Sequence, residues 1–145
     1  MSFDPVRIGV IGTGHFGILH AKTLLGLAES ELVALVDYSE KALAELPEDF
    51  SGIPKYSAPE DALRKSSAEA WVVSTSTADH VQVASMLLER DAHVLLEKPM
   101  CTSVDDAKEV VQSSKTHKGV VWIGLEYRYI ATISAALDNL TIGLV

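Results

Sequence analysis

The sequence has 145 residues, is 48% hydrophobic, and carries a formal net charge of −8 from 20 acidic and 12 basic residues. That length predicts one domain with its own core, and the acidic balance argues against a nucleic-acid partner, which requires a basic face. The lone Cys101 excludes an internal disulfide, no apolar run approaches the roughly 18 residues of a membrane span, and no signal peptide is recognisable, so we expect a cytoplasmic protein without a membrane partner.

Short apolar runs alternate with amphipathic stretches along the chain. The runs predict strands buried on both faces of a parallel sheet, over residues 6–11, 32–36, 71–73, 92–96 and 120–123. The stretches between them predict helices over residues 15–28, 39–46, 59–65, 79–90 and 104–117. Ser57, Thr77 and Ser103 are the predicted N-caps of the last three. Residues 53–56 suggest a short edge strand, and residues 130–140 a further helix.

A strand followed by a helix, repeated five times, predicts an α/β fold. Because crossovers between parallel strands are right-handed, we expect a doubly wound, mostly parallel sheet with helices on both faces, in three layers α/β/α.

The segment after the first predicted strand matches the pattern G-x-G-x-x-G, with the residues Gly12, Thr13, Gly14, His15, Phe16 and Gly17. In this pattern the first glycine permits a tight turn, the second lets the backbone approach a pyrophosphate, and the third lets the helix pack on the strand. The helix N-terminus offers free N–H groups to the phosphates. We expect all six residues to bind a dinucleotide, His15 and Phe16 through their backbone amides.

Asp37 ends the second predicted strand. It follows Gly17 by about 20 residues, the spacing of the acid that binds the adenosine ribose in the Rossmann fingerprint. Its carboxylate can accept both ribose hydroxyls and would repel a 2′-phosphate. Tyr38 and Ser39 follow it, where an NADP site would have an arginine. The sequence therefore favours NAD as the cofactor and makes NADP the less favoured choice.

Glu97, Lys98 and Pro99 follow the fourth predicted strand. Ligands of open parallel sheets bind beyond the carboxyl ends of the strands, so this run faces the predicted cofactor crevice. A lysine in that place can hydrogen-bond a substrate oxygen and carry a proton. By position alone, an exposed ion pair at the start of a loop is the more common situation.

The run Glu97-Lys98-Pro99, with the segment that follows the third predicted strand, resembles the glucose-fructose oxidoreductase / inositol dehydrogenase / MocA family. That segment has the pattern A-T-P-N-x-x-H in the family. Thr75 and His80 match it, and Ser76 and Thr77 replace the proline and the asparagine.

A later part of the chain carries the same resemblance. The family has a glycine at a strand end followed by an R-F or R-Y pair, which Gly124, Arg128 and Tyr129 match. The proline that the family has shortly after this pair is absent. The resemblance thus covers the chain from Ile8 to about Gly143.

The resemblance implies an NAD(P)-dependent oxidoreductase that transfers a hydride between the nicotinamide and a carbinol or carbonyl of a sugar, inositol or related polyol. It implies that Lys98 is catalytic, in substrate binding and proton transfer, and that Glu97 lies near the nicotinamide ribose. It extends the expected cofactor-binding set to Ser74, Thr75, His80, Glu97, Lys98 and Arg128. No metal is expected.

Members of this family have a second, larger α/β domain, which holds most of the substrate pocket and often forms an oligomer interface. We therefore expect residues 1–124 to form the dinucleotide-binding domain and residues 125–145 to be a connector, the start of a second domain that is otherwise absent. A full-length form could be a homo-oligomer. We expect the chain alone, as an excised domain or a natural short form, to bind NAD weakly with little turnover, and a robust steady-state rate would contradict this.

Three other functions remain open. A non-catalytic NAD-sensing regulatory module, like those of potassium transport, has a similar length and glycine turn. A methyltransferase also uses a glycine loop and an acid, although the complete G-x-G-x-x-G and the later lysine argue against it. A member of the family that lost catalysis could act as a redox sensor or scaffold.

The remaining histidines and tryptophans are predicted to have no role in the site. His20, in the first predicted helix, is expected to be packed or on the surface, and His117 to be solvated. Trp71 and Trp122 lie in predicted strands and are expected in the core.

Overall fold

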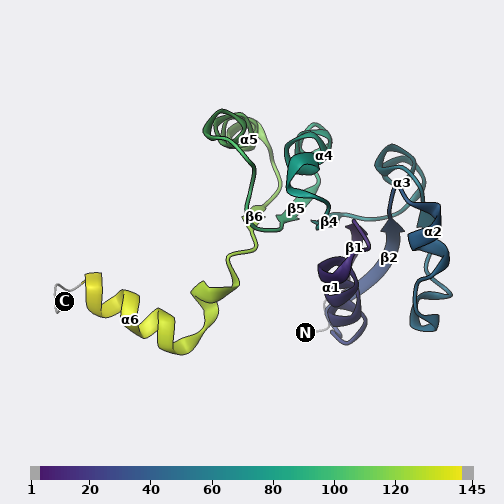
Figure 1. The fold of residues 1–145 in the computed structure, drawn as a ribbon, viewed down its shortest axis with the longest axis horizontal. Coiled ribbons are helices and arrows are strands. Elements are labelled where there is room, and N and C mark those ends of the chain that lie inside the picture. The colour runs from purple at the N-terminus through teal and green to yellow at the C-terminus, as the bar shows by residue number, and fades with distance from the viewer. Residues whose placement is uncertain (1–3, 142–145) are drawn as a thin grey trace.

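The computed structural model describes residues 4–141, so residues 142–145 of the predicted connector lie outside the described part. Its centre is a parallel sheet in the order β3-β2-β1-β4-β5-β6 (Figure 1). The strands are β1 (Val6–Ile11), β2 (Ser30–Val36), β3 (Lys55–Tyr56), β4 (Ala70–Val73), β5 (His93–Leu96) and β6 (Val121–Ile123). The order reverses between β1 and β4, and such a reversal opens a crevice at the carboxyl ends of the strands.

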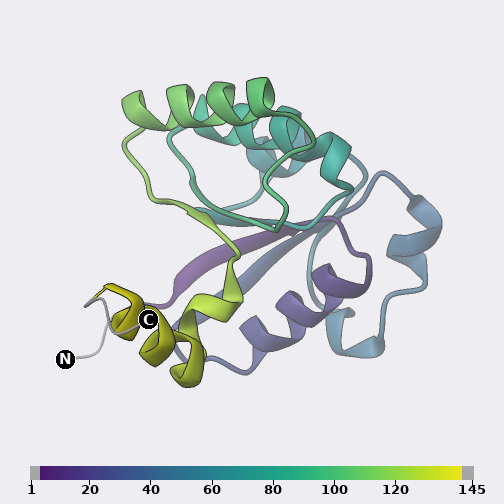
Figure 2. The same ribbon diagram turned by 60° about the vertical axis from the view of Figure 1, so that its left-hand side comes forward.

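Helices cover both faces of the sheet, as Figure 2 shows. The α-helices are α1 (His15–Leu25), α2 (Glu40–Ala44), α3 (Pro59–Lys65), α4 (His80–Leu88), α5 (Val104–Thr116) and α6 (Ala131–Thr141). Three 3-10 turns are η1 (Glu48–Phe50), η2 (Thr77–Asp79) and η3 (Glu126–Tyr129). The predicted doubly wound α/β/α fold is therefore confirmed. Helix α6 lies apart from the sheet, beyond β6 (Figure 1).

Two apolar clusters fill the two sides of the sheet. On one side, α3 and α4 pack on Ile11, Trp71 and Val73. On the other side, α1 and η1 pack on Val10 and Val72. Neighbouring residues of one strand point to opposite sides, which is why the strands are apolar at almost every position.

The N-cap predictions had mixed outcomes. Ser103 caps α5 as predicted, because its hydroxyl accepts a hydrogen bond from the Asp106 N–H at 3.1 Å. The predictions for Ser57 and Thr77 were wrong. Helix α3 begins at Pro59, which has no N–H to be capped and a φ already suited to a helix. Thr77 opens η2 instead, and α4 begins only at His80.

Two predictions about burial were also wrong. Trp71 is 1% exposed as expected, but Trp122 is 50% exposed. The side chain of His117 is fully buried, although it was expected to be solvated. None of the helices within residues 4–141 is long and apolar enough to cross a membrane.

Candidate functional site

The turn after β1 needs glycine at two positions for reasons internal to the protein. Gly12 has φ +92°, and a Cβ there would lie 2.6 Å from the carbonyl oxygen of Ser74. The Ser74 hydroxyl donates a hydrogen bond to the Gly12 oxygen at 2.9 Å. A Cβ on Gly17 would collide with that same oxygen of Gly12. These contacts fold the turn against the end of β4.

Gly14 has no such internal reason. A Cβ at this residue would meet no described atom within 4 Å, and its φ of −67° suits any residue. It is the N-cap of α1, and within residues 4–141 no side chain caps this helix, whereas Ser39 caps α2. The first helical hydrogen bond of α1 runs from the Ile18 N–H to the Gly14 oxygen. Open space above uncapped amides fits a phosphate group, which accepts hydrogen bonds from such a helix end.

Asp37 is held in place by three N–H and O–H donors. Its Oδ2 accepts hydrogen bonds from the Thr13 N–H at 2.8 Å and the Thr13 hydroxyl at 2.9 Å, and its Oδ1 accepts one from the Ser39 N–H at 2.9 Å. Thr13 is only 5% exposed. Thr13 thus joins the glycine turn to the acid at the end of β2, and the two parts of the predicted fingerprint lie together.

A hollow of about 370 Å³, the first hollow, opens beside this acid. Its walls are Ile11, Gly12, Gly14, Val36, Asp37, Tyr38, Ser74, Thr75, Ser76 and Asp79. Asp79 accepts a hydrogen bond from the Ser76 hydroxyl at 2.6 Å. Partial burial raises the pKa of the Tyr38 hydroxyl above its usual value, and the carboxylates of Glu60 and Asp79 add to that rise. The first hollow is therefore a negatively charged space.

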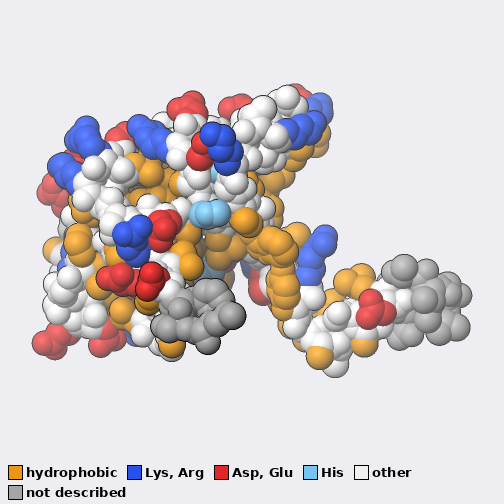
Figure 3. Space-filling model, turned by 180° about the vertical axis from the view of Figure 1, so that it is seen from behind, with side chains coloured by type: hydrophobic (Ala, Val, Ile, Leu, Met, Phe, Trp, Pro, Cys, Tyr) orange, Lys and Arg blue, Asp and Glu red, His pale blue; other side chains and the backbone are white. Residues whose placement is uncertain are grey.

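A second hollow of about 380 Å³ lies between α1 and the ends of β5 and β6. Its walls are Phe16, Leu19, His20, Leu95, Glu97, Lys98, Trp122, Gly124, Leu125, Glu126 and Tyr129. Figure 3 shows hydrophobic side chains gathered where the α6 arm leaves the body of the molecule. Gly14 lines the first hollow and Phe16 the second, so the two hollows flank the glycine turn.

Lys98 lies at the second hollow with its ammonium group among polar and aromatic partners. Its Nζ lies 3.3 Å from Glu126 Oε1 and 5.5 Å from the centre of the Phe16 ring. The backbone N–H of Glu126 and the Lys98 ammonium hold the pKa of the Glu126 carboxyl below its usual value. A lysine presented in this way can bind an oxygen of a molecule in the hollow.

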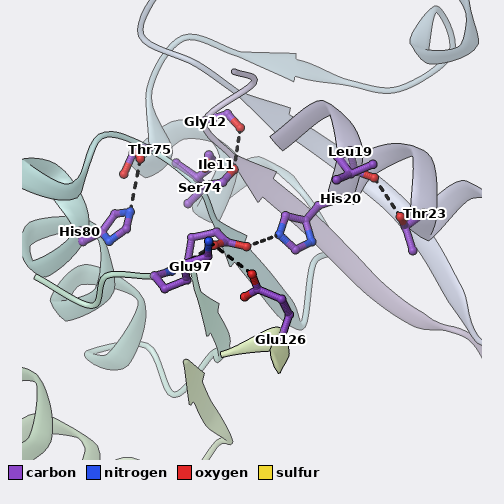
Figure 4. A network of polar contacts seen from close by, with 11 residues as sticks. Ile11, Gly12, Leu19, His20, Thr23, Ser74, Thr75, His80, Glu97 and Glu126 are labelled. Atoms are coloured by element: carbon purple, nitrogen blue, oxygen red, sulfur yellow. Dashed lines mark hydrogen bonds and ion pairs between the residues drawn. The ribbon is translucent and has the colours of Figure 1, made fainter. Parts of the chain in front are cut away.

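His80 is buried beneath the site and is only 1% exposed. Its Nε2 lies 3.3 Å from the Thr75 oxygen (Figure 4). Its Nδ1 lies 3.0 Å from the Pro99 oxygen. The ring therefore ties the loop after β4 to the loop after β5, and it has no open face for direct contact with a cofactor.

The other predicted residues are distributed around the two hollows. Thr75 lines the first hollow, and Ser74 both lines it and secures the glycine turn. The side chain of His15 is exposed and packs edge-on against the Phe16 ring. Arg128 is exposed on η3 and lines neither hollow, so its contact with a cofactor stays a prediction.

His20, which was expected to have no role in the site, points from α1 to Glu97 (Figure 4). Its Nε2 lies 2.7 Å from Glu97 Oε1. The sequence did contain a signal for this orientation. His20 follows Gly17 by three residues, and residues three apart lie on the same face of a helix, so His20 shares the face on which Gly17 packs. Within residues 4–141 no group of three or more His, Cys, Asp or Glu side chains is arranged to hold a metal ion.

Comparison with known proteins extends these observations. The chain is 28% identical over 141 residues to the myo-inositol 2-dehydrogenase of Thermotoga maritima, which covers 95% of this chain and 42% of that protein. It is 30% identical to an inositol 2-dehydrogenase/D-chiro-inositol 3-dehydrogenase of Lacticaseibacillus casei, over 97% of this chain and 41% of the relative. The chain thus spans less than half the length of these relatives.

Solved structures share the fold. The WlbA dehydrogenase of Bordetella pertussis, in complex with NADH and UDP-GlcNAcA, superposes with a TM-score of 0.88 at 24% identity, over 99% of this chain and 41% of that one. The model of the oxidoreductase family with an NAD-binding Rossmann fold, GFO_IDH_MocA, matches residues 6–125. This match covers most of the chain, which therefore belongs to the GFO_IDH_MocA oxidoreductase family.

Proposed function

We propose that this chain is the NAD-binding domain of an oxidoreductase that moves a hydride between the nicotinamide and a carbinol or carbonyl carbon of a sugar, inositol or related polyol. The observation that carries the proposal is the uncapped N-terminus of α1, with open space above Gly14 and a fixed Asp37 beside it. The names of the inositol dehydrogenase relatives support the substrate class.

The two hollows divide the work of binding. In the first hollow, the Asp37 carboxylate accepts hydrogen bonds from the hydroxyls of the adenosine ribose, and the backbone N–H groups at the start of α1 bind the pyrophosphate. The second hollow receives the nicotinamide half beside Lys98 and Glu97. Bound NAD supplies the hydride acceptor. Lys98 binds the substrate oxygen and moves its proton, which is acid–base work that a lysine at this position can perform.

The charge of the first hollow supports NAD over NADP. Asp37 is fixed at the wall of the first hollow, and Asp79 adds a second carboxylate to the same hollow. Two carboxylates repel the phosphate, whereas the ribose hydroxyls of NAD are hydrogen-bond donors for Asp37.

The substrate pocket and the oligomeric state belong to the full-length enzyme. We propose that a second domain, of the kind that the longer relatives have room for, completes the pocket above Lys98. The presence of Lys98 and Glu97 together in an apolar hollow favours this enzymatic role over NAD sensing, which needs no proton-carrying group.

Asp37→Ala tests both the binding mode and the NAD preference. We expect the Kd for NADH to rise about tenfold or more, because each hydrogen bond to a charged group contributes about 1.5–3 kcal/mol. The Kd for NADPH should change little or fall. Fluorescence titration of the purified chain measures both constants. Asp49→Ala, which removes an exposed carboxylate on η1, is the charge-matched control and should bind as the wild type does. An equal loss for the two cofactors would contradict the proposed NAD preference.

A further inference from the structure

The carboxylate of Glu97 makes two contacts at once. Its Oε1 lies 2.7 Å from His20 Nε2, and its Oε2 accepts a hydrogen bond from the Lys98 N–H at 3.0 Å. Because a carboxylate only accepts hydrogen bonds, the Nε2 of His20 is the donor in the first contact. The His20 side chain is 26% exposed and that of Glu97 is 13% exposed, so the pair is largely shielded from water. Figure 4 shows His20 reaching from α1 to Glu97.

The surroundings leave this carboxylate little freedom. The Glu97 N–H donates to the Val73 oxygen at 2.9 Å, which fixes the residue at the end of the sheet. A Cβ on Gly124 would lie 3.3 Å from Glu97 Oε1, so the loop after β6 closes over the same oxygen. Within the described part of the chain, His20 is the one side chain recorded as a hydrogen-bond partner of this carboxylate.

We propose that His20 is a positioning residue for the nicotinamide half of the site, acting through Glu97. The imidazole holds Oε1, so that Oε2 stays on the backbone N–H of Lys98 and the Lys98 ammonium stays beside Glu126 and Phe16. The inference rests on the proposed function, since it concerns the second hollow of the same site.

Removal of His20 leaves a largely buried carboxylate without its partner, which is unfavourable. The freed Glu97 then attracts the Lys98 ammonium, which lines the same hollow, and draws it away from Phe16 and Glu126. The second hollow changes shape and charge, whereas the first hollow and the amides at the start of α1 stay as they are. His20 therefore affects a ligand that enters both hollows and spares one that enters only the first.

NADH and ADP separate these two cases, because ADP has the adenosine and the pyrophosphate but no nicotinamide riboside. We expect His20→Ala to weaken NADH about tenfold, the loss of one charge-assisted contact, and to leave the Kd for ADP unchanged. His20→Gln keeps an N–H donor at similar reach and should restore NADH binding to within about threefold of the wild type. Thr23→Ala is the control and should bind both ligands normally, because Thr23 lies on the same helix and its hydroxyl donates to the Leu19 oxygen rather than into the second hollow.

Titration calorimetry of the wild type and the three variants distinguishes a failure of the role of His20 from a failure of the proposed function. Unchanged NADH binding in His20→Ala, or an equal loss of NADH and ADP, overturns the role of His20. No rescue by His20→Gln overturns it as well. If the wild type binds neither ligand, the proposed function itself is wrong, and the inference falls with it.

Discussion

Gly14→Val is expected to leave the protein folded and to abolish most of its NADH binding. No described atom lies within 4 Å of the added Cβ, and a φ of −67° with a ψ of −168° is extended backbone that valine adopts readily. A valine is a poorer N-cap than glycine, so the free energy of unfolding should fall by no more than about 1 kcal/mol. The side chain, however, fills the space above the first amides of α1, where we propose that the phosphates bind.

The expected loss of NADH affinity is about 100-fold or more, because several charge-assisted hydrogen bonds to the pyrophosphate are lost together. Fluorescence titration with NADH and urea unfolding of the same preparation measure the two effects. Gly17→Val is the contrasting variant, and it should lose stability along with binding because its Cβ collides with the Gly12 oxygen. If Gly14→Val binds NADH as the wild type does, the pyrophosphate does not lie at the start of α1.

Trp71→Ala is expected to destabilise the fold by about 3–5 kcal/mol, the range for removal of a buried tryptophan. Trp71 is 1% exposed, and its ring lies over Gly9, where even a Cβ would collide with it. Its Nε1 is buried with no recorded hydrogen-bond partner in the described part of the chain. Removing a buried polar atom that has no hydrogen-bond partner is favourable and offsets part of this cost. We therefore expect a destabilisation in the lower half of the range.

Trp122→Ala is the matched control for this prediction. Trp122 is 50% exposed and packs beside Tyr129 with 6.1 Å between ring centres, so its removal should destabilise the fold by less than about 1.5 kcal/mol. Urea unfolding of both variants gives the comparison, and each keeps one tryptophan as its fluorescent probe. Equal destabilisation by the two substitutions would mean that the Trp122 side chain is buried in the core and not exposed at the second hollow.

The sequence predicted the sheet and the glycine turn well because both depend on local patterns. Strands that are apolar at nearly every position should be covered on two sides, and the structure has such strands at β1, β2, β4 and β5, whereas β6 is open on one side. The spacing from Gly17 to Asp37 predicted that the turn and the acid meet, and Thr13 joins them. The sequence could not show which glycines are required by contacts inside the protein and which one leaves open space, because that depends on the atoms around each glycine in the folded chain.

What the sequence missed depends on contacts between distant segments. His20 and Glu97 are 77 residues apart, and no local pattern shows that a helix side chain will reach a strand end. Trp122 has the apolar neighbours of a core residue, but α1 stops short of covering β6 on that side, and the residue stays half exposed. His80 matched a family pattern for a cofactor loop, yet its ring is buried under that loop.

The most direct test of the central claim is the melting temperature of this chain with NADH, NADPH and S-adenosylmethionine. A ligand present at about 100 times its Kd adds roughly 2.7 kcal/mol to the free energy of unfolding. We predict that NADH raises the melting temperature by several degrees, that NADPH raises it less, and that S-adenosylmethionine has no effect. A rise with S-adenosylmethionine alone, or no rise with NADH at saturating concentration, would contradict the assignment of this chain as an NAD-binding domain.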